Sequence, residues 1–235
     1  MATFNMENNN KNRPFLIVIT LVVIAALIAV VFFVYNNKNK AAPENIGKNL
    51  EVSYTEQSDM GSYIEFKLPG ANKKVIDNFS DPQCDHCATF KKNNEENILQ
   101  ALKMKHTLRF HPMTFLDKQN NNDYSSRVTE ALVILAKNNE SQAAWELYNE
   151  IWDNQEATTT NAQLADFSQN HGASPESAQK IRELSEGTLG KSIGDVNFSA
   201  VSQNIGQVTV PLILIDRTTL VDPINNTQEI PSKLR

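Results

Sequence analysis

The sequence predicts an α/β domain with an inserted α-helical domain, preceded by one N-terminal transmembrane helix. Three observations lead to this fold class. A run of 21 residues at 15–35 has no charge and is long enough to cross a bilayer. Segments with strand and helix patterns then follow in the order β-β-α-β, and residues 124–186 look almost wholly helical. After a further helix, the apolar, β-branched run at 208–216 is typical of a buried strand.

The composition excludes several classes of protein. Of the 235 residues, 21% are charged and 40% are hydrophobic, which excludes wholesale disorder and a multi-pass membrane protein. Two cysteines are too few for a disulfide-rich scaffold or a four-thiolate zinc site. The formal net charge is −5, and because residues 1–40 carry +3, residues 41–235 carry about −8. This acidity argues against a nucleic-acid partner, since phosphate binding depends on clustered Lys and Arg.

The uncharged run from Phe15 to Tyr35 is interpreted as an uncleaved signal anchor. Such a helix spans about 31 Å, close to the thickness of the bilayer hydrocarbon. The apolar core of a cleaved signal peptide is shorter, at about 7–15 residues. The alternative, a buried helix of a soluble core, is disfavoured because the run has no polar face. Basic residues flank both ends, so the positive-inside count does not decide the orientation.

The α/β domain begins with two strand-like stretches. Residues 62–68 and 73–79 carry them, and a turn signal at 69–72 separates them. A helix is expected from Asp85 to Lys103, followed by a strand at 106–112. The predicted organisation is a tail at 1–14, the anchor at 15–35, a polar Asn- and Lys-rich linker at 36–60, the α/β domain at 61–115 and 187–235, and the helical insertion at 116–186.

Four segments of the insertion have apolar residues at spacings of three and four, as amphipathic helices do. Thr158–Thr160 and Ser174-Pro175 supply helix caps and starts. Trp145, Tyr148 and Trp152 are expected to pack inside rather than to form a binding site. The four segments are 127–137, 142–152, 161–171 and 174–184.

The two cysteines stand together as C-D-H-C, at residues 84–87, between a strand and a helix. A C-x-x-C at this position is the signature of a thioredoxin-like redox site, because the helix N-terminus stabilises the thiolate of the first cysteine. Half of a zinc site is an alternative, but no histidine pair shows matching spacing. A structural disulfide is another, although so short a loop constrains the unfolded chain little. The redox interpretation is favoured.

Three segments resemble DsbA-type thiol–disulfide oxidoreductases. Residues 79–87, FSDPQCDHC, are similar to the family's F-S-D-x-Q-C-x-x-C stretch. Residues 144–155, AWELYNEIWDNQ, resemble its W-E run that ends in N-Q, and residues 206–211, GQVTVP, resemble its G-V-x-x-[TV]-P segment. The resemblance covers roughly residues 60–222 and implies a thioredoxin fold interrupted by a helical domain.

The resemblance also implies roles for the motif residues. Cys84 would attack and form the mixed disulfide with substrate, and Cys87 would resolve it. His86 matches a position that stabilises the thiolate in C-P-H-C members. Asp85 stands where the family usually has proline. Its negative charge opposes the Cys84 thiolate, although an acid in the first turn of a helix is itself favourable. Asp85 is therefore a candidate for tuning the redox properties of the site. No metal and no bound cofactor are expected, because the Cys84–Cys87 pair is the redox group.

Two further features concern the surroundings of the cysteines. By resemblance, the Val210-Pro211 bond is cis, and this loop presents its backbone to an extended substrate. Family members usually carry an acid six residues before the first cysteine, as a proton acceptor for the second thiol. Here Asn78 occupies that position, and strand alternation predicts that Asp77 points away. No general base is assigned, and water is one route for the proton.

The leading hypothesis is a bacterial, membrane-anchored oxidase that introduces disulfides into exported cysteine-containing proteins. A quinone-linked membrane partner of the DsbB or VKOR type would restore its disulfide. Because disulfides persist in oxidising compartments, the N-terminus is expected in the cytoplasm and the catalytic domain outside the cell membrane. One alternative is a tethered reductase or isomerase, motivated by Asp85. Another is a non-catalytic protein-binding module, because Asn78 stands where the family usually has an acid.

Overall fold

The computed structural model describes residues 46–156, 158–185 and 187–235. The predicted tail, the signal anchor and the first ten residues of the predicted linker lie outside the described residues. In the part of the chain that is described, no helix is long and apolar enough to cross a membrane. Residues 46–235 form one unit by their internal contacts.

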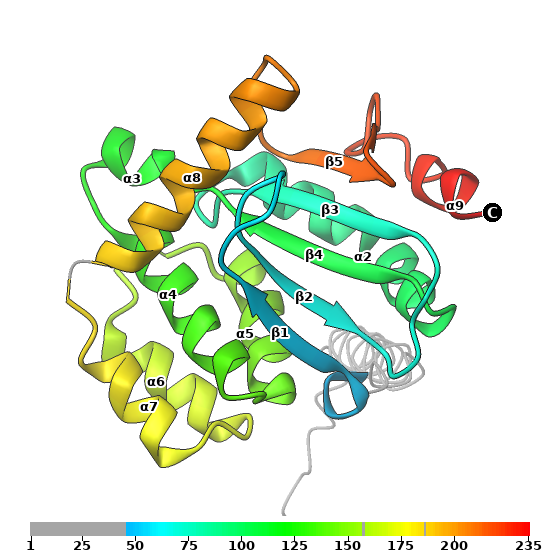
Figure 1. Ribbon diagram of the computed structural model, residues 1–235. Coiled ribbons are helices and arrows are strands. Elements are labelled where there is room, and N and C mark those ends of the chain that lie inside the picture. The colour runs from blue at the N-terminus through cyan, green and yellow to red at the C-terminus, as the bar shows by residue number, and fades with distance from the viewer. Residues whose placement is uncertain (1–45, 157, 186) are drawn as a thin grey trace, which may run out of the picture. The chain divides into compact units, whose positions relative to one another are not determined.

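A mixed sheet of six strands forms the centre of this unit (Figure 1). The strand order is β1-β2-β4-β3-β5-β6, in which β3 and β4 are parallel and the other neighbours antiparallel. A parallel pair needs a crossover connection, which helix α2 supplies. The strands are β1 (Glu51–Thr55), β2 (Tyr63–Lys67), β3 (Val75–Ser80), β4 (Thr107–Pro112), β5 (Leu212–Ile215) and β6 (Thr218–Thr219).

Helices fall into two groups. The first group lies outside the insertion in the sequence, and the second forms the insertion between β4 and α8. The first consists of the 3-10 helix η2 (Ile46–Asn49), α2 (Asp85–Lys103), α8 (Thr188–Asn204) and α9 (Glu229–Leu234). The second consists of α3 (Phe115–Asn120), α4 (Tyr124–Lys137), α5 (Ser141–Asp153), α6 (Asn161–Asn170) and α7 (Pro175–Arg182).

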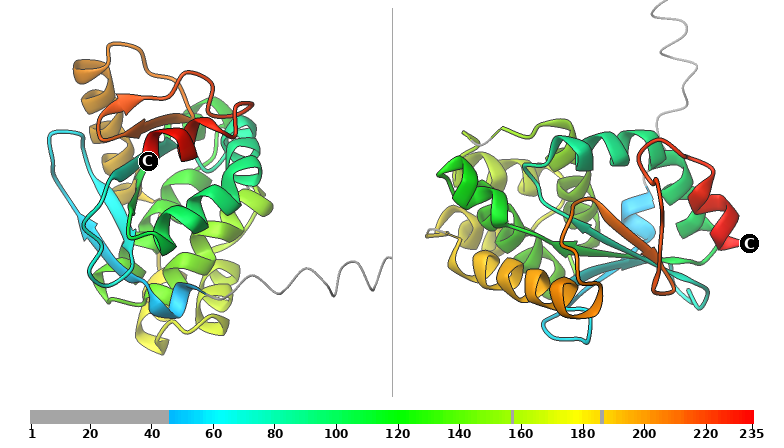
Figure 2. Two further views of the ribbon diagram at one scale, coloured as in Figure 1. Left: turned by 90° about the vertical axis from the view of Figure 1, so that its right-hand side faces the viewer. Right: turned by 90° about the horizontal axis from the view of Figure 1, so that it is seen from above.

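The two faces of the sheet pack into different cores, because successive strand residues point to opposite faces. Ile76 of β3 belongs to the larger core, together with Phe90 of α2. Phe79, also on β3, belongs to a smaller core that includes Val201 of α8. Figure 2 shows α2 and α8 on opposite sides of the strands.

The predicted elements of the insertion are confirmed. Helices α4 to α7 coincide with the four amphipathic segments to within three residues at each end. Thr160 and Gln163 form a capping box at the start of α6, and the Ser174 side chain accepts a hydrogen bond from the Ser177 N–H at the start of α7. Trp145, Tyr148 and Trp152 are buried in the larger core, as predicted.

The structure differs from the sequence prediction at both ends of the sheet. Residues 46–55, assigned to the linker, form η2 and the edge strand β1, which pairs with β2. This strand was missed because its polar residues dominate the pattern and only Val52 is buried. The last apolar run is a strand only from Leu212 to Ile215, since residues 208–211 form a loop that enters it.

Glycines allow α8 to lie against the start of α4 and against Thr114, the N-cap residue of α3. A Cβ atom on Gly190 would lie 1.9 Å from the backbone oxygen of Ser126, and one on Gly194 would lie 2.0 Å from the Thr114 hydroxyl oxygen. Real side chains do not approach so closely, so only glycine permits this packing. Because the chain runs from α8 directly into residues 205–211, this contact also locates the loop before β5.

We expect Gly190→Ala to lower the free energy of unfolding by about 1–3 kcal/mol, since the added methyl group must displace backbone. In an unobstructed helix interior the same change would raise stability by up to about 1 kcal/mol. Urea unfolding of the variant measures the sign. Ser192→Ala, at an exposed position of α8, is the matched control and should change stability little. A stabilised Gly190→Ala protein would contradict the close packing.

Candidate active site

Cys84 lies at the N-terminus of α2, where it is the N-cap residue. Its own N–H donates to the Asp81 carbonyl at 2.9 Å, and its carbonyl accepts from the N–H of Cys87 at 2.9 Å. The backbone N–H groups of His86 and Cys87, in the first turn of α2, act to lower the pKa of its thiol. The side chains of Asp85 and His86 are exposed. The local sequence therefore places a sulfur where a helix offers free N–H groups.

The two sulfurs are not bonded to each other, and their environments differ. A hydrogen bond from the Cys87 thiol lowers the pKa of Cys84 to about 7, assisted by the two N–H groups and opposed by burial and by the Asp81 charge. Burial raises the pKa of the Cys87 thiol far above its usual range, and the neighbouring Cys84 sulfur raises it further. Cys84 is thus the sulfur that is readily ionised at neutral pH, and Cys87 is held as a thiol. This asymmetry is what an attacking and a resolving cysteine require.

The loop before β5 faces the cysteines. Val210-Pro211 is a cis peptide bond, as the family resemblance implied. The Cys84 sulfur lies 3.8 Å from the Val210 carbonyl oxygen, to which its thiol donates. Residues that are 126 positions apart in the chain therefore meet at one site. A polypeptide bound at Cys84 would lie next to the backbone of residue 210.

Asp81 links the loop before α2 to the helical insertion. Its carboxylate accepts from the Ser125 hydroxyl at 2.6 Å, from the Leu116 N–H at 3.0 Å and from the Gln83 N–H at 3.1 Å. Burial raises the pKa of Asp81 to about 6, although these hydrogen bonds oppose the shift. No role was predicted for Asp81, although it lies within the F-S-D-x-Q-C segment.

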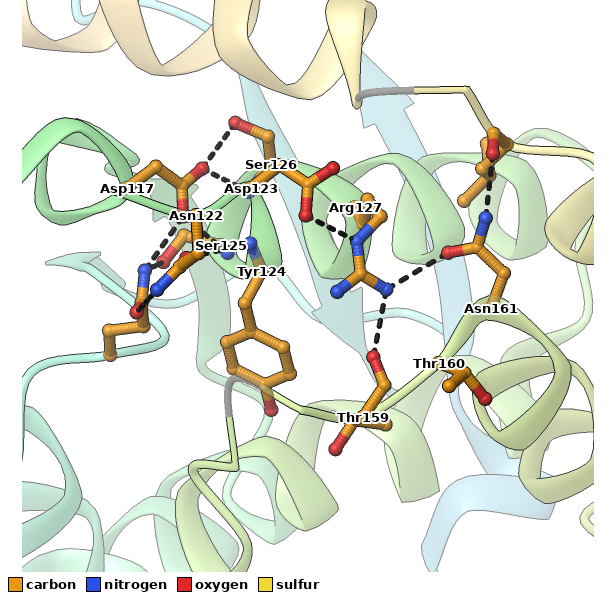
Figure 3. Close-up of polar contacts among 12 residues, drawn as sticks. Asp117, Asn122, Asp123, Tyr124, Ser125, Ser126, Arg127, Thr159, Thr160 and Asn161 are labelled. Carbon is orange, nitrogen blue, oxygen red and sulfur yellow. Dashed lines mark hydrogen bonds and ion pairs between the residues drawn. The ribbon is translucent and has the colours of Figure 1, made fainter. Parts of the chain in front are cut away.

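Two side-chain amides also hold this loop. Gln83 donates to the Asp117 carboxylate at 2.7 Å, and Asp117 in turn accepts the N–H groups of Ser125 and Ser126 at the start of α4 (Figure 3). From the other side, the Gln155 amide donates to the carbonyls of Pro82 (2.8 Å) and Cys84 (3.1 Å). Gln155 is the last residue of the segment at 144–155 that resembles the family. That resemblance was the only feature of the sequence that pointed to Gln155.

The segment that follows Gln155 is tied to α4 by Arg127. The Arg127 guanidinium donates to Asp123 at 2.7 Å, to the Thr159 carbonyl at 2.9 Å and to Asn161 at 2.9 Å (Figure 3). These contacts lie within the insertion and do not reach the cysteines. They hold the chain that carries Gln155 in place.

The strand residues before the motif lie as alternation predicts. Asp77 points to the face away from Cys87 and contacts the buried His111 ring nitrogen at 2.9 Å. Asn78 points to the Cys87 side and donates to the Tyr148 hydroxyl at 3.1 Å. No group of three His, Cys, Asp or Glu side chains suited to a metal ion occurs among the described residues.

The fold and site define a thioredoxin-like protein with a C-x-x-C motif at a helix N-terminus opposite a cis-proline. The chain matches the family model described as thioredoxin over residues 70–229, and it belongs to that family. A comparison with curated proteins found no match.

Solved structures with this fold include several thiol–disulfide oxidoreductases. MdbA from Corynebacterium diphtheriae, described as a thiol-disulfide oxidoreductase, has a TM-score of 0.66 and 21% identity, covering 81% of this chain and 100% of its own. BdbD from Bacillus subtilis has a TM-score of 0.59 and 14% identity, covering 78% and 98%. DsbA from Mycobacterium tuberculosis has a TM-score of 0.52 and 16% identity, with the same coverage. At these identities the likeness establishes the fold.

Cys87→Ala should raise the pKa of Cys84 from about 7 toward the ordinary cysteine value of about 8.5, because the Cys87 thiol is the main group that lowers it. Thiolate absorbance at 240 nm, followed against pH, measures the midpoint. The chain has only two cysteines, so the signal is unambiguous. Cys84→Ala is the control and should show no thiolate near pH 7. An unchanged midpoint in Cys87→Ala would show that another group stabilises the thiolate.

The raised pKa of Asp81 predicts a pH dependence of stability. The folded protein holds the proton of the Asp81 carboxyl group more tightly than the unfolded chain does. The stabilisation of the fold by this proton is therefore full below the pKa of the unfolded chain, near 3.8, and is lost as pH rises through about 6. Between pH 7.5 and 5.0, Asp81 should therefore add about 1 kcal/mol to the free energy of unfolding. Urea unfolding of wild type and Asp81→Asn at both pH values isolates this contribution. The lowered pKa of His111 acts in the opposite direction in both proteins and cancels in the comparison. If the difference in the free energy of unfolding between wild type and Asp81→Asn is the same at both pH values, the pKa of Asp81 is not raised.

Proposed function

We propose that the protein is an extracytoplasmic thiol–disulfide oxidoreductase that introduces disulfides into exported proteins. The observation that carries the proposal is the pairing of an ionisable Cys84 with a buried Cys87 thiol, opposite the Val210 carbonyl. Residues 15–35 would anchor it as a single-pass protein with a cytoplasmic N-terminus. The structural relatives described as thiol–disulfide oxidoreductases support the chemistry.

The oxidase reaction uses the Cys84–Cys87 disulfide as its redox group, with no other cofactor. A substrate thiolate attacks the Cys84 sulfur, the bond between the two cysteines breaks, and the electron pair leaves on Cys87. A second substrate thiolate then attacks the substrate sulfur of the mixed disulfide and expels Cys84. Helix N–H groups stabilise this leaving thiolate. The substrate loses two electrons, and a quinone-linked partner of the DsbB or VKOR type would remove them from the dithiol.

A reductase or isomerase is the second candidate, and the environment of Cys84 favours it. Its pKa of about 7 equals the value of about 7 in thioredoxin, whereas the cysteine of DsbA has about 3.5. A less stabilised thiolate makes the dithiol a better electron donor. Asp85, exposed in the first turn of α2, adds a negative charge beside Cys84 where the family usually has proline.

The full-length protein in detergent should speed the oxidative folding of a reduced secreted protein such as ribonuclease A. Cys84→Ala should abolish the effect because it removes the attacking sulfur. The oxidase function requires a reduction potential in glutathione buffers well above that of thioredoxin, about −270 mV, and toward that of DsbA, about −120 mV. Asp85→Pro should raise it further.

The possible outcomes separate the candidates. A potential near about −270 mV, with ready reduction of insulin, would make the reductase the better assignment. If the wild-type protein neither oxidises nor reduces substrate, the protein is a binding module rather than an enzyme.

A further inference from the structure

The end of the sheet opposite the cysteines carries a cluster of cationic side chains. Strand β3 starts at this end and runs toward Cys84. Figure 1 shows the loop between β2 and β3, the end of α2 and α9 together on this side of the molecule. We call the cluster the basic end, and its members are Lys73, Lys74, Lys103, Lys105, Lys233 and Arg235.

Hydrogen bonds hold the segments of the basic end together. The Lys73 N–H donates to the Lys105 carbonyl at 3.2 Å, which joins the loop before β3 to the loop after α2. The Lys74 ammonium group donates to the backbone oxygens of Lys233 (2.6 Å) and Arg235 (3.0 Å) in and after α9. Cations from three separate segments are therefore fixed side by side.

The basic end contrasts with the acidic character of the domain, since residues 41–235 carry about −8 in total. Lys73, Lys74 and Arg235 line a shallow pocket of about 400 Å³, and Asp216 also lines it. Three cations against one carboxylate give this pocket a side-chain charge of about +2. The pocket suits an anionic group such as a phosphate.

An exposed apolar side chain lies within the basic end. Met104 is 47% exposed and stands between Lys103 and Lys105. Surfaces that combine Lys side chains with exposed apolar ones bind the boundary between the headgroups and the acyl chains of a bilayer. Met104 therefore favours a lipid surface over a partner that is anionic throughout.

The described chain begins at the same end of the sheet. Glu51, the first residue of β1, pairs with Lys67, which pairs in turn with Thr107 next to the basic end. Ile46 lies 11 positions beyond the predicted anchor, so the chain between them reaches at most about 40 Å. A compact domain of this size is itself about 40 Å across. The tether thus keeps the domain near the bilayer but does not by itself decide which end faces the lipid.

We propose that the basic end binds anionic lipid headgroups and holds the catalytic end away from the bilayer. This inference rests on the membrane anchor of the proposed function. Helix α2 joins the two ends, with Cys84 as its N-cap and Lys103 as its last residue, and its 19 residues span about 28 Å. Docking through the basic end therefore places Cys84 up to about 28 Å farther from the headgroups, toward exported substrates. Exposed charge contacts are weak and reversible, so the domain can still turn toward a membrane partner.

Energy transfer between full-length protein and lipid headgroups tests this orientation. The protein is incorporated into nanodiscs of phosphatidylcholine, alone or mixed with phosphatidylglycerol, with an acceptor dye on the headgroups. A donor dye is attached to Cys84 in a Cys87→Ala protein, or to an Asn72→Cys protein that also carries Cys84→Ala and Cys87→Ala. Asn72 is exposed beside Lys73. Phosphatidylglycerol should lower the transfer from position 84 and raise the transfer from position 72.

Charge reversal identifies the side chains responsible. Each lysine near an anionic surface contributes about fivefold to binding, so Lys73→Glu with Lys233→Glu should lower the ratio of docked to undocked protein by about 25-fold or more. Both lysines are exposed, so the fold should be retained. The matched control is Lys118→Glu with Lys191→Glu, which makes the same change of charge at exposed positions of α3 and α8 and should leave both transfer changes in place.

Three results would overturn the proposal. Transfer that is equal in the two kinds of nanodisc would do so, and an acidic protein would then be the better partner for the basic end. Transfer that falls from both positions would indicate repulsion of the acidic domain instead of docking. Unchanged behaviour of the Lys73→Glu, Lys233→Glu protein would also contradict it.

The same experiment separates this proposal from the proposed function. Full-length protein that does not co-purify with the nanodiscs would refute the membrane anchor, and this inference with it. Protein that co-purifies with them but does not respond to lipid charge would refute the role of the basic end alone.

Discussion

The site depends on hydrogen bonds that hold residues 81–84 between the sheet and the helical insertion. Asp81 and Gln83 reach the start of α4, and Gln155 binds the carbonyls of the same loop from the other side. Each contact joins segments at least 34 residues apart. The insertion therefore determines how the first turn of α2 presents its N–H groups to Cys84. A thioredoxin-like sheet and helix without it would lack these supports.

The chemistry follows from unequal burial of two identical side chains. Cys84 is 8% exposed and is the N-cap residue of α2, whereas Cys87 is 1% exposed and lies in the larger core. Desolvation penalises a thiolate at Cys87 much more than at Cys84. Cys84 is thereby the more exposed and the more readily ionised sulfur, and Cys87 is held as a buried thiol.

Position 78 carries an asparagine rather than an acid, and this changes the polar surroundings of the buried Cys87 sulfur. A carboxylate at that position would titrate and would repel a thiolate while ionised. A neutral amide and two hydroxyl groups are hydrogen-bonded there instead: the Ser80 hydroxyl donates to Asn78, and the Asn78 amide donates to the Tyr148 hydroxyl. This buried side of the site therefore carries hydrogen-bonded neutral groups rather than a charged one.

The sequence by itself determined the features that depend on local patterns. The four insertion helices, the caps at Thr160 and Ser174 and the side of β3 on which Asp77 lies follow from periodicity and local hydrogen bonding. The C-x-x-C motif at a helix start was equally visible, and the cis-proline came from resemblance. Only the tertiary structure decided which distant side chains meet. The edge strand β1 depends on pairing with β2, and Tyr148, expected only to pack, reaches Asn78 across 70 positions. No local pattern encodes such contacts, because they arise where separate elements pack against one another.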